Sequence, residues 1–160
     1  MAGKKDTWDR LATDIESTVE QACNRLTGLT AETIEMRPQP SAWSVKEIIG
    51  HLVDSASNNH QRFVRLQIAD KLVFPDYSQD NSIWIAVQKY QEASWDELLS
   101  MWRYYNLHLA RVIRSVNTDC IGHLWIMNKD TAISLGDLMT DYLRHLKDHL
   151  RQVEQNLAFL

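Results

Sequence analysis

The chain has 160 residues, of which 44% are hydrophobic and 24% are charged, and its formal net charge is −4. This length and composition are sufficient for one domain with its own hydrophobic core, which we expect to span residues 1–160. The excess of acidic over basic residues argues against a nucleic-acid-binding surface. The sequence contains no run of about 18 apolar residues, so we expect no membrane span.

Cysteine use and the N-terminal sequence favour a cytoplasmic protein. Cys23 and Cys120 form neither a C-x-x-C motif nor a disulfide framework, which fits a reducing compartment. No apolar segment follows the first six residues, so we expect no signal peptide.

The first predicted element is a long amphipathic helix at residues 7–26, with Thr7 as a suitable N-cap. Apolar residues recur there at spacings of three and four, which places them on one face of a helix. They are Trp8, Leu11, Ile15, Val19, Ala22 and Leu26. One or two helical turns are expected at residues 30–36, before a break at the proline-containing residues 37–41.

A capping box opens the second long helix, which is predicted at residues 45–69. The Ser44 hydroxyl can accept from the amide of Glu47, and the Glu47 carboxylate can reach back to the Ser44 amide. Its predicted buried side consists of Val45, Ile48, Ile49, Leu52, Ala56, Phe63 and Val64. Residues 74–77 interrupt this helix, and a short helical segment is expected at residues 82–92.

Two further serine caps, Ser94 and Ser134, open long helices that we expect to end near residues 116 and 157. Residues 117–133, between these helices, have no helical period and favour a small hairpin or an extended loop. Four long helices with long second and third connections predict an all-α four-helix bundle with a crossover connection.

Two histidines on the last predicted helix, His145 and His149, are the strongest functional signal. Four residues are just over one turn, so both imidazoles point the same way and form half of a divalent-metal site. The third ligand must come from another element, and His51, on the flank of the buried side of the second long helix, is the candidate. His60 is a rival that we interpret as a packed histidine, and the pair on the last helix could also have a structural or surface role.

For several other residues near these histidines, the sequence leaves two roles possible. Asp54, Asp141 and Asp148 lie one turn from them and could orient an imidazole, although they could equally be solvated acids. Trp84 and Trp125 could wall a pocket, although packing in the core is the competing interpretation. The pattern assigns no site role to the remaining histidines, His108 and His123.

Residues 43–55 (WSVKEIIGHLVDS) resemble the second-helix signature of the DinB/YfiT-like superfamily. The pair of histidines at residues 145–149 resembles the family's second motif, which lies on the last helix. Residues 62–63 and 75–77 are similar to the YfiT-type branch. In the order of its elements, the likeness extends over residues 8–157.

This resemblance implies an up-down-down-up bundle in which His51, His145 and His149 bind nickel, zinc, iron or manganese. Some relatives transfer a low-molecular-weight thiol to electrophiles, and many are regarded as metal-dependent hydrolases. The resemblance therefore implies a bacterial, homodimeric, metal-dependent enzyme, a thiol S-transferase or a hydrolase, that acts on a small molecule. The alternative is a non-catalytic stress-response or scaffold bundle whose metal site is vestigial or structural.

Overall fold

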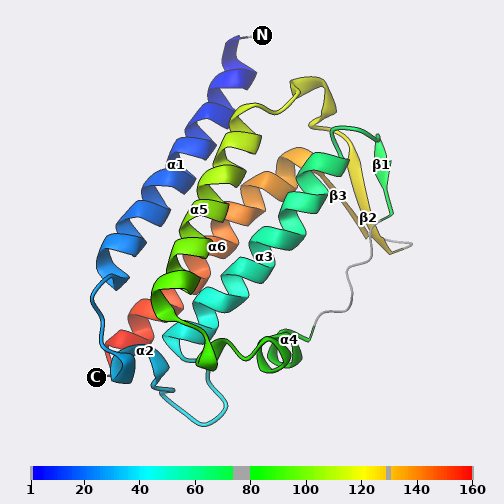
Figure 1. Ribbon diagram of the computed structural model, residues 1–160. Helices are drawn as coiled ribbons and strands as arrows, with labels where there is room; N and C mark the ends of the chain where they lie inside the picture. The colour runs from blue at the N-terminus through cyan, green and yellow to red at the C-terminus, as the bar shows by residue number, and fades with distance from the viewer. Residues whose placement is uncertain (1, 74–79, 129–130, 160) are drawn as a thin grey trace.

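The computed structural model describes residues 2–73, 80–128 and 131–159 and is mainly helical (Figure 1). The long helices are α1 (Ala2–Leu26), α3 (Val45–Arg65), α5 (Trp95–Arg114) and α6 (Leu135–Leu157). The short helices are α2 (Ala31–Glu35), α4 (Asn81–Gln88) and the 3-10 helices η1 (Tyr90–Glu92) and η2 (Thr118–Cys120). The strands are β1 (Lys71–Leu72), β2 (Leu124–Asn128) and β3 (Thr131–Ser134). Within these described ranges, no helix has the length and apolar character needed to cross a bilayer.

The four long helices form the predicted bundle. Both α1 and α3 pack against α5 and α6, so α1 and α3 occupy opposite corners. In Figure 1, α1 and α6 run downward while α3 and α5 run upward, which confirms the up-down-down-up order. The crossover joins the parallel helices α3 and α5. The break predicted at residues 74–77 belongs to this connection but lies outside the described residues.

Serine caps fix the start of three long helices. Ser44 Oγ accepts from the Glu47 amide at 3.1 Å, and Glu47 Oε2 accepts from the Ser44 amide at 2.9 Å, so the predicted capping box is present. Ser94 and Ser134 each accept from the backbone amide three residues later. These caps satisfy amides that have no partner inside the helix.

Two helix boundaries differ from the prediction. The first helix begins at Ala2, so Thr7 lies inside it and is not its cap, because the residues before Thr7 are also helical. The helix α3 ends at Arg65 and not at residue 69. Just beyond it, His123 Nδ1 donates to the Leu66 carbonyl at 2.6 Å, which ties this end of the helix to the segment that enters β2.

A three-stranded sheet, in the order β1-β2-β3, lies beside the bundle. The antiparallel pair β2–β3 is the hairpin favoured by the sequence, and it places Trp125 opposite Ile133. The sequence did not predict β1, whose Lys71 pairs with Leu124 in a parallel register. A two-residue strand has no periodicity of its own, so only its pairing with β2 identifies it.

The first half of α3 is buried on all sides. Every residue from 45 to 56 is buried, because α2, α4 and η1 pack on the part of the helix that α5 and α6 leave open. Charged side chains in this stretch are paired. Lys46 Nζ donates to Glu35 Oε1 at 3.0 Å and to a backbone carbonyl of η1 at 2.8 Å, and Arg37 Nε donates to Glu47 Oε2 at 3.0 Å. These bonds hold the short helices against α3.

Gly50 allows η1 to lie directly against α3. A Cβ atom at Gly50 would lie 2.3 Å from the ring of Tyr90. The Tyr90 hydroxyl and Gln88 Nε2 both donate to Asp54 Oδ1, each at 2.7 Å. Burial raises the pKa of Asp54, and these two hydrogen bonds oppose that rise. The glycine therefore gives the α4–η1 segment its anchoring point on the helix that carries His51.

A Gly50→Ala variant should be less stable than the wild type by about 1–3 kcal/mol, because the Tyr90 ring must move to admit the methyl group. The intrinsic preference of alanine for helix, about 1 kcal/mol, acts in the opposite direction. Urea unfolding measures the difference. Gly122→Ala is the control, because the added methyl group meets nothing within 4 Å. Equal stability of the two variants would contradict the steric argument.

Candidate metal centre

Three histidines from two helices meet where α3 packs against α6. One ligand nitrogen from each of His51, His145 and His149 lies within 4.8 Å of the other two. The Nε2 atoms of His145 and His149 are 3.2 Å apart. The ring centroid of His51 lies 5.4 Å from that of His145 and 4.6 Å from that of His149. The structure thus brings together the three residues named by the family resemblance.

The sequence pattern placed His51 on the flank of the buried side of its helix. In the structure the residue is buried in the core. It is 4% exposed, and its ring packs against Trp43 and the two histidines of α6. Neither ring nitrogen has a hydrogen-bond partner among the described residues. An unsatisfied buried polar group typically destabilises a fold by about 1–3 kcal/mol. A metal ion is a partner that would satisfy such a nitrogen, so the residues present fit a metal site.

Side chains on α3 and α6 orient the two half-buried imidazoles. The Oε1 atom of Gln152 lies 3.1 Å from His149 Nδ1, and an amide oxygen only accepts, so Nδ1 carries the proton and Nε2 keeps its lone pair. Ser55 Oγ lies 3.4 Å from His145 Nδ1 and can accept from it in the same way. Neither Gln152 nor Ser55 was predicted from the sequence to have a role in the site. Helical spacing is the signal that could have identified them, because residues three or four apart lie on the same face of a helix. Gln152 follows His149 by three residues, and Ser55 follows His51 by four.

The acids considered for this orienting role have other partners. Asp54 accepts from two side chains of the α4–η1 segment. Asp141 and Asp148 pair with Arg144 on the exposed face of α6, at 2.6 and 2.8 Å. The amide of Gln152 and the hydroxyl of Ser55, and not a carboxylate, therefore orient the imidazoles of His149 and His145.

Burial keeps all three imidazoles neutral. Desolvation, with smaller contributions from His149 and His145, lowers the pKa of His51 to about 3. Desolvation and the nearby His149 lower the pKa of His145 to about 4. Desolvation also lowers the pKa of His149, against the opposing effects of Gln152 and Asp148. At neutral pH the cluster therefore has the uncharged form that binds metal ions.

Trp43, in the loop before α3, packs against the cluster. Its ring centroid lies 5.2 Å from that of His51 and 6.2 Å from that of His149. Asn156 Nδ2 donates to the Trp43 carbonyl at 2.8 Å, which holds this loop against α6. This contact could not be predicted from the sequence, because it depends on how the loop folds back over the end of the helix.

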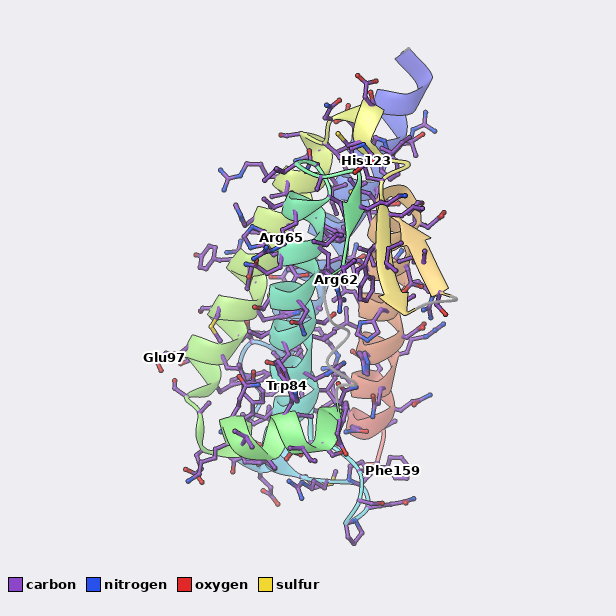
Figure 2. All side chains as sticks on the ribbon, turned by 90° about the vertical axis from the view of Figure 1, so that its right-hand side faces the viewer. Arg62, Arg65, Trp84, Glu97, His123 and Phe159 are labelled. Carbon is purple, nitrogen blue, oxygen red and sulfur yellow. The ribbon has the colours of Figure 1, made fainter. Side chains whose placement is uncertain are left out.

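A cavity of about 400 Å³ lies beside the cluster, between the bundle and the sheet. His51 and His145 line it, and so do Trp125, Met127 and Ile133 from the hairpin. The indole of Trp125 thus both packs in the core, where the residue is buried, and walls the cavity. Figure 2 shows Trp84 on α4, at a lower level than the sheet.

The other three histidines lie outside the cluster. The ring centroids of His60 and His108 are 5.0 Å apart, and His60 Nδ1 lies 3.2 Å from the Tyr105 hydroxyl. Both histidines are half-buried where α3 packs against α5, which agrees with the packed position predicted for His60. His123 lies at the C-terminal end of α3 (Figure 2), about 20 Å along the helix from His51.

Comparison with known proteins gives one family and a structural relative. A family model of the DinB superfamily matches residues 9–153. The solved structure described as "YfiT from Bacillus subtilis is a probable metal-dependent hydrolase with an unusual four-helix bundle topology" is similar, with a TM-score of 0.78. The alignment has 16% sequence identity and covers 98% of this chain and 87% of that chain, so it shows a common fold. Comparison with curated proteins gives no match.

The metal-free protein should lose stability as the pH falls from about 6.5, the ordinary pKa of histidine, towards 4. The unfolded chain takes up protons over this range while the buried imidazoles do not, so protonation favours unfolding. Each such histidine adds a slope of up to about 1.4 kcal/mol per pH unit. Urea unfolding of chelator-treated wild type and His51→Phe measures this slope. The variant should show a smaller slope, and equal slopes would contradict the burial argument.

Proposed function

The chain belongs to the DinB superfamily, and from this premise we propose that it is a metal-dependent enzyme acting on a small molecule. In this proposal His51, His145 and His149 are the metal ligands. One observation carries the proposal: both nitrogens of His51 are buried without a hydrogen-bond partner among the described residues, beside two imidazoles whose Nε2 atoms lie 3.2 Å apart.

The donor set favours a divalent transition metal. Three neutral imidazoles suit zinc, nickel, iron or manganese, and they leave coordination positions for water or substrate. They also leave the double positive charge of the ion uncompensated by ligand charge. When bound, such an ion would lower the pKa of a water molecule or of a low-molecular-weight thiol, so that an anionic nucleophile forms near neutral pH.

The protein's own residues prepare this chemistry. The core around His51 holds its imidazole neutral, while Gln152 and Ser55 hold the Nδ1 side of the α6 imidazoles. Trp43 covers part of the cluster, and the adjoining cavity offers room for a substrate. Two reaction classes fit this arrangement. They are hydrolysis, in which water attacks, and S-transfer, in which a thiol attacks an electrophile.

Substitution of one ligand tests the proposed site. His149→Ala should lose most of the bound metal, because it removes one of three ligands, while the helical circular dichroism should persist. The helices have their own caps and apolar faces, which do not depend on the ion. Metal per chain is measured by elemental analysis after reconstitution with zinc or nickel. His108→Ala is the matched control, a half-buried histidine outside the cluster, and should bind metal like the wild type.

Three outcomes separate the possibilities. Full metal occupancy in His149→Ala would show that His149 is not a ligand. Loss of metal together with unfolding would indicate a structural ion in a non-catalytic bundle. Loss of metal with the fold intact should be accompanied by loss of any activity that the reconstituted wild type shows on ester and amide substrates or on thiol and electrophile pairs.

A further inference from the structure

We propose that the hydroxyl group of Ser55 donates a hydrogen bond to the substrate, and that the cavity accepts a carbonyl compound with an apolar body. This inference rests on the proposed function, because the metal-binding role of His145 decides which partner of Ser55 is the donor. Binding of a carbonyl oxygen by Ser55 can nevertheless be measured separately from metal binding.

Ser55 lies where the histidine cluster meets the cavity. The residue lines the cavity together with His145, and its Oγ atom lies 3.4 Å from His145 Nδ1. If His145 binds a metal through Nε2, the atom that lies 3.2 Å from His149 Nε2, the neutral imidazole carries its proton on Nδ1. The Ser55 oxygen then accepts from His145, and the hydroxyl proton is left for another partner.

A second donor occupies the same oxygen. Asn59 Nδ2 donates to the Ser55 carbonyl at 2.9 Å and to Ser55 Oγ at 3.4 Å. The orientation of this amide agrees with its other contact, because Arg62 Nη1, which can only donate, lies 3.4 Å from Asn59 Oδ1. A hydroxyl oxygen has two lone pairs, so the bonds from His145 and Asn59 use both of them. The group can therefore form a further hydrogen bond only as a donor.

The helix backbone does not accept this proton. A hydroxyl group inside a helix can donate to the carbonyl four residues earlier, as Thr13 in α1 and Thr140 in α6 do at 2.9 and 3.0 Å. Within the described part of the chain, the Ser55 hydroxyl has contacts with His145 and Asn59 and forms no such bond. The residue is only 9% exposed, so a molecule that fills the cavity would keep water from this donor and leave it unsatisfied unless the molecule itself supplies an acceptor.

The remaining lining suits a molecule with one polar end. Met127, Ile133 and Leu138 supply apolar surface, and a volume of about 400 Å³ is in the usual range for small-molecule sites. A carbonyl oxygen bound to Ser55 would lie close to His145 and so to the proposed metal site. Hydrolysis of an ester or an amide, and addition of a thiol to a conjugated carbonyl compound, both develop negative charge on such an oxygen, which a nearby donor stabilises.

The test compares 4-phenyl-2-butanone with butylbenzene, which has the same carbon skeleton but no hydrogen-bond acceptor. Both ligands are titrated into the zinc-loaded protein and followed by NMR. In Ser55→Ala the ketone should bind about five-fold more weakly than in the wild type, as expected for the loss of one neutral hydrogen bond, while binding of butylbenzene changes little. Ser57→Ala, a matched change at an exposed serine of α3, should bind both ligands like the wild type.

Zinc content and helical circular dichroism are measured for every variant. An affinity for the ketone that is unchanged in Ser55→Ala would overturn the inference. Equal losses of affinity for the ketone and for butylbenzene would also overturn it, because they would indicate an altered cavity shape and not a lost hydrogen bond. If the wild type binds no zinc, the proposed function fails, and the same titrations of the zinc-free protein decide the role of Ser55 by the same two criteria.

A measurement on the wild type covers the case in which Ser55→Ala does not fold or does not bind zinc. The methyl group next to the carbonyl of 4-phenyl-2-butanone should show a nuclear Overhauser effect to the β protons of Ser55. The phenyl protons should show theirs to the side chains of Met127 and Ile133. A bound ketone whose methyl group has no contact with Ser55 would overturn the inference.

Discussion

The first half of α3 is buried on every side, so each polar group that the helix carries there must find a hydrogen-bond partner or destabilise the fold. Lys46, Glu47 and Asp54 are buried, and each has a hydrogen-bonded partner on the short helices or the loop before α3. His51 is buried to the same extent, but both of its ring nitrogens lack a partner among the described residues. Among the described residues, Asp54 keeps one oxygen, Oδ2, without a partner, whereas the imidazole of His51 has no partner at either nitrogen.

The two helices contribute differently to the cluster. The imidazole from α3 is fixed by the packing around it, whereas those from α6 are half-buried and are oriented by hydrogen bonds to Gln152 and Ser55. If an ion binds, the imidazole from α3 would be the ligand that packing holds in place, while the hydrogen bonds from Gln152 and Ser55 would set the ring orientation of the other two. The same burial lowers the pKa of the histidines, so protons compete weakly with a metal at neutral pH.

Much of the fold could be predicted from sequence, because its signals are local. The Ser44–Glu47 capping box and the apolar stripes located the long helices to within a few residues. The strand β1 and the contact of Trp43 with His51 could not be predicted, because both depend on segments that meet only after folding. For the site, His145 and His149 followed from helical spacing, whereas His51 as their companion required the family resemblance. The burial of His51 could not be predicted either, because its ring packs against Trp43 and the histidines of α6, which meet it only after folding.

Two parts of the fold line the cavity, the helical bundle and the β2–β3 hairpin. The histidines belong to α3 and α6, inside the bundle, while Trp125, Met127 and Ile133 come from the hairpin beside it. Changes at Met127 and Ile133, which are not fully buried, can therefore alter the shape or polarity of the cavity while the helices that position the histidines keep their packing. Such a division would let relatives diverge in what the cavity holds while retaining one helical scaffold, with variation concentrated in a short segment of chain.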